Sequence, residues 1–202
     1  MSFETNYTPA NINDVVFTNA ITEAKIKAIF QGYRSRSLFL WGSNGNGKTL
    51  VADLVAQHLT QHCPFLLDSK SIEQLMREED IYQYIHRIKN FAVCSGAKST
   101  DRVVMVFHEL DEYKGSLSNL WIAMDRLKDD LMVIITTNNP MSFQNAVRSR
   151  CEKIEFNNVT PQNFLNRAQL ILNAEGVTLS NNDVVHYLTT MTTKTRDVRD
   201  YL

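Results

Sequence analysis

Several features are scarce in this chain of 202 residues, and each scarcity excludes a class of protein. Only three cysteines occur, Cys63, Cys94 and Cys151, without any Cys-x-x-Cys pair, which is typical of a reducing compartment and argues against a structural zinc site. No apolar run approaches the roughly 20 residues of a membrane span. The first residues also lack the basic and apolar regions of a secretory signal. We therefore expect a soluble cytoplasmic chain that binds no membrane.

Neither sign of charge is in excess. The sequence has 21 Lys and Arg residues against 22 Asp and Glu residues, a net charge of −1. This balance excludes a protein that binds nucleic acid through a basic surface overall, so any such binding must come from a local patch. Hydrophobic residues make up 44% and charged residues 21%, which excludes disordered and collagen-like chains.

Glycine is scarce as well, but three of the seven glycines fall within six residues. They belong to the segment 42–49, which fits the pattern G-x-x-x-x-G-K-[ST] at every position. Such a loop directs backbone N–H groups at phosphate oxygens, while its lysine contacts the β- and γ-phosphates and its hydroxyl binds Mg²⁺. The alternative is a glycine turn with an incidental lysine. We expect the following residues at a nucleotide: Gly42, Ser43, Asn44, Gly45, Asn46, Gly47, Lys48, Thr49 and Leu50.

Short apolar runs alternate with amphipathic stripes along the first three quarters of the chain. The runs predict strands at 37–41, 65–67, 103–107, 131–136 and 153–156. The stripes predict helices at 50–59, 81–91 and 117–127. Nearly continuous apolar strands separated by amphipathic helices predict an α/β fold, a parallel five-stranded sheet with helices on both faces.

The pattern changes after Phe156. Residues 157–161 read as a linker, and helical spacing follows at 164–172, at 184–188 and around Val198. We expect a nucleotide-binding domain at 1–157 and a small helical domain at 158–202. The second unit is too short for much stability of its own and should depend on the first.

The third predicted strand runs directly into His108-Glu109-Leu110-Asp111-Glu112. An ATPase needs carboxylates at such a strand end, one to support Mg²⁺ and one to position the attacking water. Glu109 stands where the water-activating carboxylate belongs. His108 stands where an aspartate would support Mg²⁺, and an imidazole is a poor ligand for that ion. A zinc-protease motif is excluded because Glu112 is not a second histidine.

Three consequences of His108 remain open at this point. Asp111 could supply the missing charge, a water held by His108 could suffice, or hydrolysis could be slow. A fourth alternative is that His108 only forms hydrogen bonds within the site. We expect hydrolysis to persist but to be slower than in a His108→Asp variant.

With both motifs placed, the chain resembles AAA+ ATPases, and specifically the small ATPase subunit of sliding-clamp loaders of the phage type. The segment from Tyr7 to Val16 resembles the family's opening, which wraps the adenine, so the resemblance places Val15 and Val16 in the base pocket. The segment 134–140 resembles the sensor-1 strand end and places Asn138 near the γ-phosphate; an ordinary Asn-Asn-Pro turn is the alternative.

Two arginines complete the resemblance. Ser149-Arg150-Cys151 resembles the Ser-Arg-Cys motif, whose arginine reaches into the ATP site of the neighbouring subunit. The segment 195–202 resembles the sensor-2 helix, where Arg199 would reach over the nucleotide. A surface ion pair or a solvent-exposed arginine is the alternative for each.

The resemblance implies a P-loop NTPase of the AAA+ type that uses ATP and Mg²⁺. It implies a ring or spiral of identical or paralogous subunits that loads a sliding clamp onto primer-template DNA, in the cytoplasm, or the host cytoplasm if the chain is phage-encoded. The collar domain of such loaders is apparently absent. DNA would be bound through its phosphates, and our candidates for those contacts are Arg87, Lys89, Lys98 and Arg102.

Three other functions remain open. A helicase loader would share every nucleotide residue and differ only in its partner. A nucleotide-gated binding module that scarcely hydrolyses ATP is favoured by His108 and opposed by Glu109 and Arg150. A small-molecule P-loop kinase would have no need of Asn138 or of the Ser-Arg-Cys motif.

Overall fold

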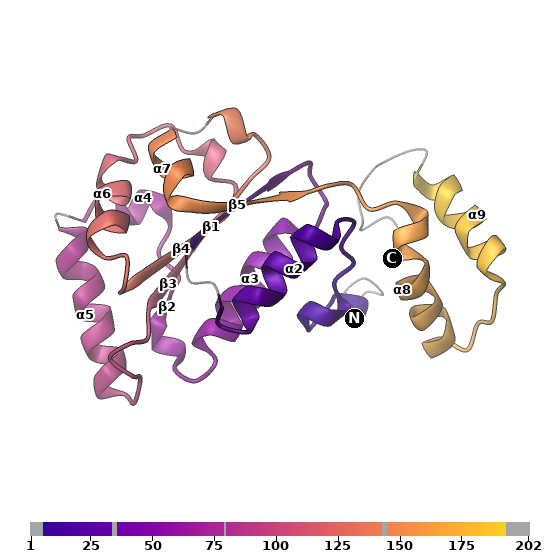
Figure 1. The fold of residues 1–202 in the computed structure, drawn as a ribbon, viewed down its shortest axis with the longest axis horizontal. Coiled ribbons are helices and arrows are strands. Elements are labelled where there is room, and N and C mark those ends of the chain that lie inside the picture. The colour runs from indigo at the N-terminus through magenta and orange to yellow at the C-terminus, as the bar shows by residue number, and fades with distance from the viewer. Residues whose placement is uncertain (1–5, 34–35, 79, 143–144, 193–202) are drawn as a thin grey trace.

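The centre of the molecule is a five-stranded parallel sheet (Figure 1). The structure is a computed structural model and describes residues 6–33, 36–78, 80–142 and 145–192. The strands are β1 (Ser37–Gly42), β2 (Leu67–Asp68), β3 (Val103–Phe107), β4 (Leu131–Thr137) and β5 (Cys151–Phe156), in the order β2-β3-β4-β1-β5. All pairs are parallel. The predicted fold class is confirmed.

Helices cover both faces of this sheet, as predicted. On one face lie α2 (Ala20–Phe30) and α3 (Lys48–Thr60), which share a buried cluster with Leu38, Leu40 and Ile134. The residue between the two leucines, Phe39, belongs to the cluster on the opposite face because neighbouring side chains of a strand point to opposite sides. That face is covered by α4 (Ile72–Leu75), α5 (Ile81–Cys94), α6 (Ser118–Arg126) and α7 (Asn145–Arg150).

The double cover explains why the central strands read as unbroken apolar runs. All seven residues of β4 are buried. Only its last two, Thr136 and Thr137, are polar, and both make hydrogen bonds to the loop that follows β3. The apolar core therefore ends at the last two residues of β4, where buried side chains become polar and hydrogen-bonded.

The strand predicted at 65–67 is wrong by two residues. Pro64–Leu66 forms a 3-10 turn, and the strand is limited to Leu67–Asp68. Proline sets the backbone angle at the start of the turn. The Phe65 ring then turns outward, where it meets the ring of Phe91 edge to face at 5.0 Å. Other 3-10 turns lie at Ile12–Asp14, Leu110–Glu112 and Pro140–Ser142.

Two further helices follow the sheet, α8 (Pro161–Ala174) and α9 (Asn181–Thr192). They pack against each other through a separate cluster that includes Phe164, Ala168, Val184 and Leu188. Figure 1 shows this pair beside the sheet, beyond β5. The division of the chain at residues 157 and 158 stays a prediction, and the turns predicted around Val198 lie outside the described residues.

No helix that the structure describes is both long enough and apolar enough to cross a membrane. The three cysteines are free thiols, of which Cys63 and Cys151 are buried and Cys94 is exposed. Burial raises the pKa of the Cys151 thiol to about 12.

The contact between Gly42 and Phe156 joins the two strands that end next to the glycine-rich loop. Gly42 is paired with Phe156 in the sheet and has φ = +148°. A Cβ atom at this position would lie 2.1 Å from the carbonyl oxygen of Phe156. Only glycine therefore allows β1 to turn into the loop at this close approach to β5.

We expect Gly42→Ala to lower the free energy of unfolding by about 3 kcal/mol, because it adds a backbone clash to an unfavourable φ. Gly96→Ala is the matched control, since Gly96 has φ = +105° but no atom within 4 Å of its added Cβ. It should lower that free energy by only about 1–2 kcal/mol. Urea unfolding measures both values, and equal losses would contradict the role assigned to the Phe156 contact.

Candidate functional site

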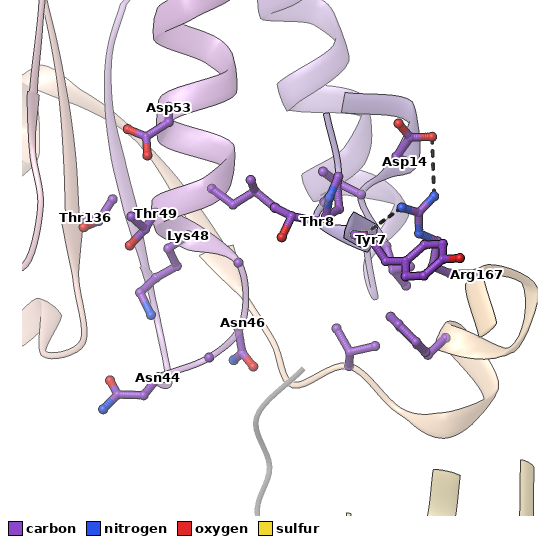
Figure 2. A pocket seen from close by; sticks show the side chains of 18 of the residues that line it. Tyr7, Thr8, Asp14, Asn44, Asn46, Lys48, Thr49, Asp53, Thr136 and Arg167 are labelled. Atoms are coloured by element: carbon purple, nitrogen blue, oxygen red, sulfur yellow. Dashed lines mark hydrogen bonds and ion pairs between the residues drawn. The ribbon is translucent and has the colours of Figure 1, made fainter. Parts of the chain in front are cut away.

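A cavity of about 570 Å³ opens at the carboxyl ends of the strands. Its walls come from the N-terminal segment 7–16, the glycine-rich loop, the first turns of α3, the ends of β3 and β4, and the start of α8. The size is ordinary for a small-molecule site, and the carboxyl edge of an open parallel sheet is where such sites form. Figure 2 shows the loop and α3 facing the N-terminal segment across it.

Lys48 occupies the glycine-rich loop as a buried cation. Its side chain is only 6% exposed, and its ammonium donates hydrogen bonds to the carbonyl oxygens of Gly42 (2.9 Å) and Ser43 (2.6 Å). Burial lowers the pKa of Lys48, and the nearby carboxylates of Glu109 and Asp111 oppose that shift. The loop therefore holds a positive charge in hydrogen bonds to carbonyl oxygens, with two carboxylates nearby, and this charge can attract an anion such as phosphate.

Asn46 ties the loop to the segment that leads into α8. Its amide nitrogen donates to the carbonyl oxygen of Phe156 (3.2 Å) and to Oδ1 of Asn158 (2.9 Å). Gly47 follows with φ = +79° and precedes α3, so the loop enters the helix through a left-handed turn. The predicted loop residues Asn44 to Leu50 all line the cavity.

The far end of the cavity is largely apolar. Val15 and Val16, which the sequence places at a base, lie on this wall. Val159 and Phe164 line it from the other side, at the start of the C-terminal helices. A flat apolar group such as a purine base would find apolar side chains here.

Arg167 closes this end of the cavity. Its guanidinium donates to the carbonyl oxygen of Tyr7 (3.0 Å) and lies 3.6 Å from the carboxylate of Asp14. Figure 2 shows these contacts between α8 and the N-terminal segment. The first and last thirds of the chain thus meet at the base end of the cavity.

Glu109 reaches the cavity from a strained turn after β3. It is the one non-glycine residue with positive φ in the described part of the chain, at φ = 48° and ψ = 42°. Its N–H donates to the Thr136 hydroxyl at 3.1 Å, which holds the turn against β4. Strain of this kind costs of order 1–3 kcal/mol and is typical of functional positions.

Asp111 lies beside the cavity but does not line it. Its Oδ1 accepts hydrogen bonds from the Thr137 hydroxyl (2.7 Å) and from the N–H of Asn138 (3.4 Å). The Asp111 carboxylate therefore holds the end of β4 in place through these two hydrogen bonds. The Asn138 side chain belongs to the cavity wall, as the sequence predicts for a residue near the phosphates.

His108 also lies outside the cavity wall and contacts a residue of α3. Its Nε2 is 3.1 Å from Oδ1 of Asp53. Asp53 itself lines the cavity, one helical turn beyond Thr49 (Figure 2). The structure thus brings a second carboxylate to the cavity from a helix, in addition to that of Glu109 after β3.

The donors at the phosphate end fit a small, hard cation. Thr49 contributes a hydroxyl and Asp53 and Glu109 contribute carboxylates to the same wall. Mg²⁺ at nucleotides binds one or two such protein oxygens and completes its shell with phosphates and water. Within the described ranges, no three His, Cys, Asp or Glu side chains gather closely enough to hold a metal by themselves.

Arg150 lies at the opposite edge of the sheet, immediately before β5. Its guanidinium forms two hydrogen bonds to Asp125, at 2.7 and 2.5 Å, and lies 4.9 Å from the centre of the Trp121 ring. Hydrogen bonds from Arg150 hold the pKa of the Asp125 carboxyl below its ordinary value. The arginine is thus fixed at the surface, away from the cavity of its own chain.

Two of the predicted DNA contacts, Arg87 and Lys89, lie on α5, and the other two precede β3. Arg87 is exposed and lies 3.8 Å from Glu78. Lys89 is paired with Asp130 and only 12% exposed, so its charge is already neutralised. Lys98 is exposed, and Arg102 directly precedes β3. Arg199 lies outside the described residues.

Sequence reasoning missed several residues of the cavity. Asp53 stands inside α3, beyond the glycine-rich motif, and Thr136 lies in the segment 134–140, in which only Asn138 was given a role. Phe164 and Arg167 belong to an amphipathic helix whose pattern indicates packing only. The signal that was available is helical spacing, since Asp53 lies four residues after Thr49 and so on the same face of α3.

Several solved structures of a Thermotoga maritima protein have this fold. The RuvB Holliday junction branch migration motor superposes with a TM-score of 0.66 at 14% identity, over 96% of this chain and 62% of that one. Two substituted forms of RuvB give TM-scores of 0.69 and 0.67 at 13% and 14% identity, over 99% and 96% of this chain and 63% and 62% of theirs. The chain thus spans about three fifths of the length of these structures.

At this level of identity the likeness shows the fold alone. No curated protein sequence matches the chain significantly. The family is shown by the sequence instead. Residues 38–159, more than half of the chain, match the ATPase family associated with various cellular activities (AAA). This match begins in β1 and ends just beyond β5, so it contains the glycine-rich loop, Glu109 and Arg150. The chain belongs to the AAA family of ATPases.

Proposed function

We propose that the chain is an ATP-hydrolysing subunit of a clamp-loader-type assembly acting on DNA. In this proposal each nucleotide is held between the cavity of one subunit and Arg150 of the next. The observation that carries the proposal is the placement of the Lys48 loop and Arg150 at opposite edges of one sheet.

The cavity has the two ends that ATP requires. The Lys48 loop would hold the phosphates, because its buried ammonium and the N–H groups at the start of α3 offer positive charge. Val15, Val16 and Phe164 would enclose the base. Mg²⁺, when bound at Thr49, supplies charge neutralisation for the phosphates.

Glu109 is placed to act as the general base. It lines the cavity on the phosphate side and is held in its strained turn by Thr136. A carboxylate there can accept a proton from a water that attacks the terminal phosphate. The side-chain amide of Asn138, on the same wall, would orient that water.

Arg150 cannot serve the cavity of its own chain. β1 and β5 pair in register from Ser37 with Cys151 to Gly42 with Phe156, so Arg150 precedes one end of β5 and the loop follows the other end of β1. Six residues of strand span roughly 17–20 Å, which is farther than an arginine side chain reaches. A phosphate contact by Arg150 therefore requires a second subunit, and a guanidinium delivered in this way makes hydrolysis depend on assembly.

The sequence resemblance to clamp-loader subunits supplies the proposed partner, and the exposed basic residues supply a surface for DNA. Arg87 and Lys98 remain candidates for sequence-independent phosphate contacts, and Arg102, directly before β3, is a third. Lys89 would first have to leave Asp130. Contacts of this kind weaken steeply as the salt concentration rises.

We expect Glu109→Gln to lower the steady-state rate of ATP hydrolysis by about 100-fold or more, because an amide cannot accept the proton. The affinity for ATP should remain within a factor of about three. Glu112→Gln is the control, since Glu112 is exposed in the same turn and does not line the cavity. Phosphate release and equilibrium binding measure the two quantities. Hydrolysis at an unchanged rate in Glu109→Gln would contradict the assignment.

Mixing two inactive variants tests whether Arg150 acts between subunits. Arg150→Ala keeps an intact loop and Lys48→Ala keeps an intact arginine, so each alone should be nearly inactive. In an equal mixture, about one quarter of random interfaces combine an intact loop with an intact arginine, and about a quarter of wild-type activity should return. A mixture that shows only the sum of the two separate activities would contradict action between subunits.

Partner binding separates the clamp loader from the helicase loader. We expect the wild-type chain, with Mg²⁺ and AMP-PNP, to retain the sliding clamp of its own replication system in a pulldown, and Lys48→Ala to lose that retention because nucleotide binding drives the gripping state. Retention of the replicative helicase in place of the clamp would favour the helicase loader. Binding without detectable hydrolysis would favour a nucleotide-gated module.

A further inference from the structure

We infer that Asp53 supplies the carboxylate that supports Mg²⁺ at the nucleotide, and that His108 positions it. The inference rests on the proposed function, because it requires ATP in the cavity. In this inference His108 does not remove the carboxylate that supports Mg²⁺. Asp53 of α3 supplies it in place of an aspartate at position 108.

Asp53 is the available carboxylate on the correct wall. Among the described residues, the carboxylates that line the cavity are Asp14, Asp53 and Glu109. Asp14 lies at the base end beside Arg167. Glu109 is assigned to the attacking water, which leaves Asp53 for the cation.

The position of Asp53 on α3 also favours this role. It lies four residues after Thr49, so the two side chains leave the same face of the helix one turn apart. Figure 2 shows both on the side of α3 that faces Thr136 at the end of β4. An ion bound at the Thr49 hydroxyl could therefore hold a water that Asp53 accepts from, which is how Mg²⁺ often engages carboxylates.

Asp111 and His108, the two residues that the sequence offered for supporting Mg²⁺, lie less favourably for this role than Asp53. Asp111 has its Oδ1 engaged by Thr137 and by the Asn138 N–H, and it does not line the cavity. His108 does not line the cavity either, and its imidazole nitrogen is a poor ligand for Mg²⁺. Its Nε2 instead lies 3.1 Å from one oxygen of Asp53.

The contact with His108 explains how a residue of a half-exposed helix face can be held in one orientation. The side chain of Asp53 is 44% exposed and that of His108 39% exposed, so neither is fixed by burial. This contact restrains the carboxylate at Oδ1 and leaves Oδ2 to accept a hydrogen bond from a water.

The test compares AMP-PNP affinity in excess Mg²⁺ with that in EDTA. We expect Mg²⁺ to tighten binding to the wild type, and Asp53→Asn to reduce that gain by roughly 10- to 100-fold. Affinity in EDTA should be unchanged, because the substitution is isosteric and removes no contact to the nucleotide. His108→Ala should reduce the gain by a smaller factor, also without an effect in EDTA.

The double variant Asp53→Asn/His108→Asp provides the rescue. It returns a carboxylate to the end of β3, so it should recover most of the gain that Asp53→Asn loses. Titration of the AMP-PNP complexes with Mn²⁺, followed by the electron paramagnetic resonance signal of the free ion, gives the cation affinity directly. It should follow the same order: wild type and double variant tight, Asp53→Asn weak.

The outcomes separate this inference from the proposed function. If the wild type binds no AMP-PNP with or without Mg²⁺, the proposed function fails. If it binds AMP-PNP but Asp53→Asn keeps the full gain from Mg²⁺ and the full Mn²⁺ affinity, the inference is overturned while the proposed function stands. If Asp53→Asn loses the gain and the double variant fails to recover it, the equivalence of Asp53 with a carboxylate at position 108 is overturned.

Discussion

All five strands run in the same direction, and this shared polarity sorts the chemistry-bearing residues to two edges of the sheet. Residues that follow a strand, such as Lys48, Glu109 and Asn138, meet at the carboxyl edge. Residues that precede a strand, such as Arg150 and Arg102, lie at the amino edge. The cavity at one edge and Arg150 at the other are therefore two consequences of one arrangement.

The sequence predicts those parts of the site that depend on local pattern and strand order. The glycine-rich loop has a motif of its own, and Glu109 and Asn138 directly follow runs that can only be buried strands. Because parallel strands share one carboxyl edge, placing each residue after its strand is enough to place it near the loop. The cavity contains all three, and Val15 and Val16 as well.

The remaining parts depend on which elements meet in space, and no local pattern encodes that. Helical spacing puts Asp53 on the same face of α3 as Thr49, but its contact with His108 appears only when the fold brings the end of β3 beside that helix. Arg167 closes the cavity because α8 returns to Tyr7, 160 residues earlier in the chain. The turn at Pro64–Leu66 was mistaken for a strand because a buried leucine and an exposed phenylalanine look alike in a short apolar run.

Arg150 is ordered at the surface by residues of its own chain, and this order bears on the proposed contact with a second subunit. The paired hydrogen bonds to Asp125 and the contact with the Trp121 ring hold a long side chain in one orientation. Ordering such a side chain on association otherwise costs about 0.5–1.5 kcal/mol. Because the guanidinium is already ordered, little of its attraction to a phosphate of a neighbouring subunit would be offset by this ordering cost. The same carboxylate also competes for the charge, so transfer of Arg150 to a nucleotide would be favoured only where the phosphate charge exceeds that of Asp125. A triphosphate meets this condition better than a diphosphate, which would make the interface sensitive to the state of the nucleotide.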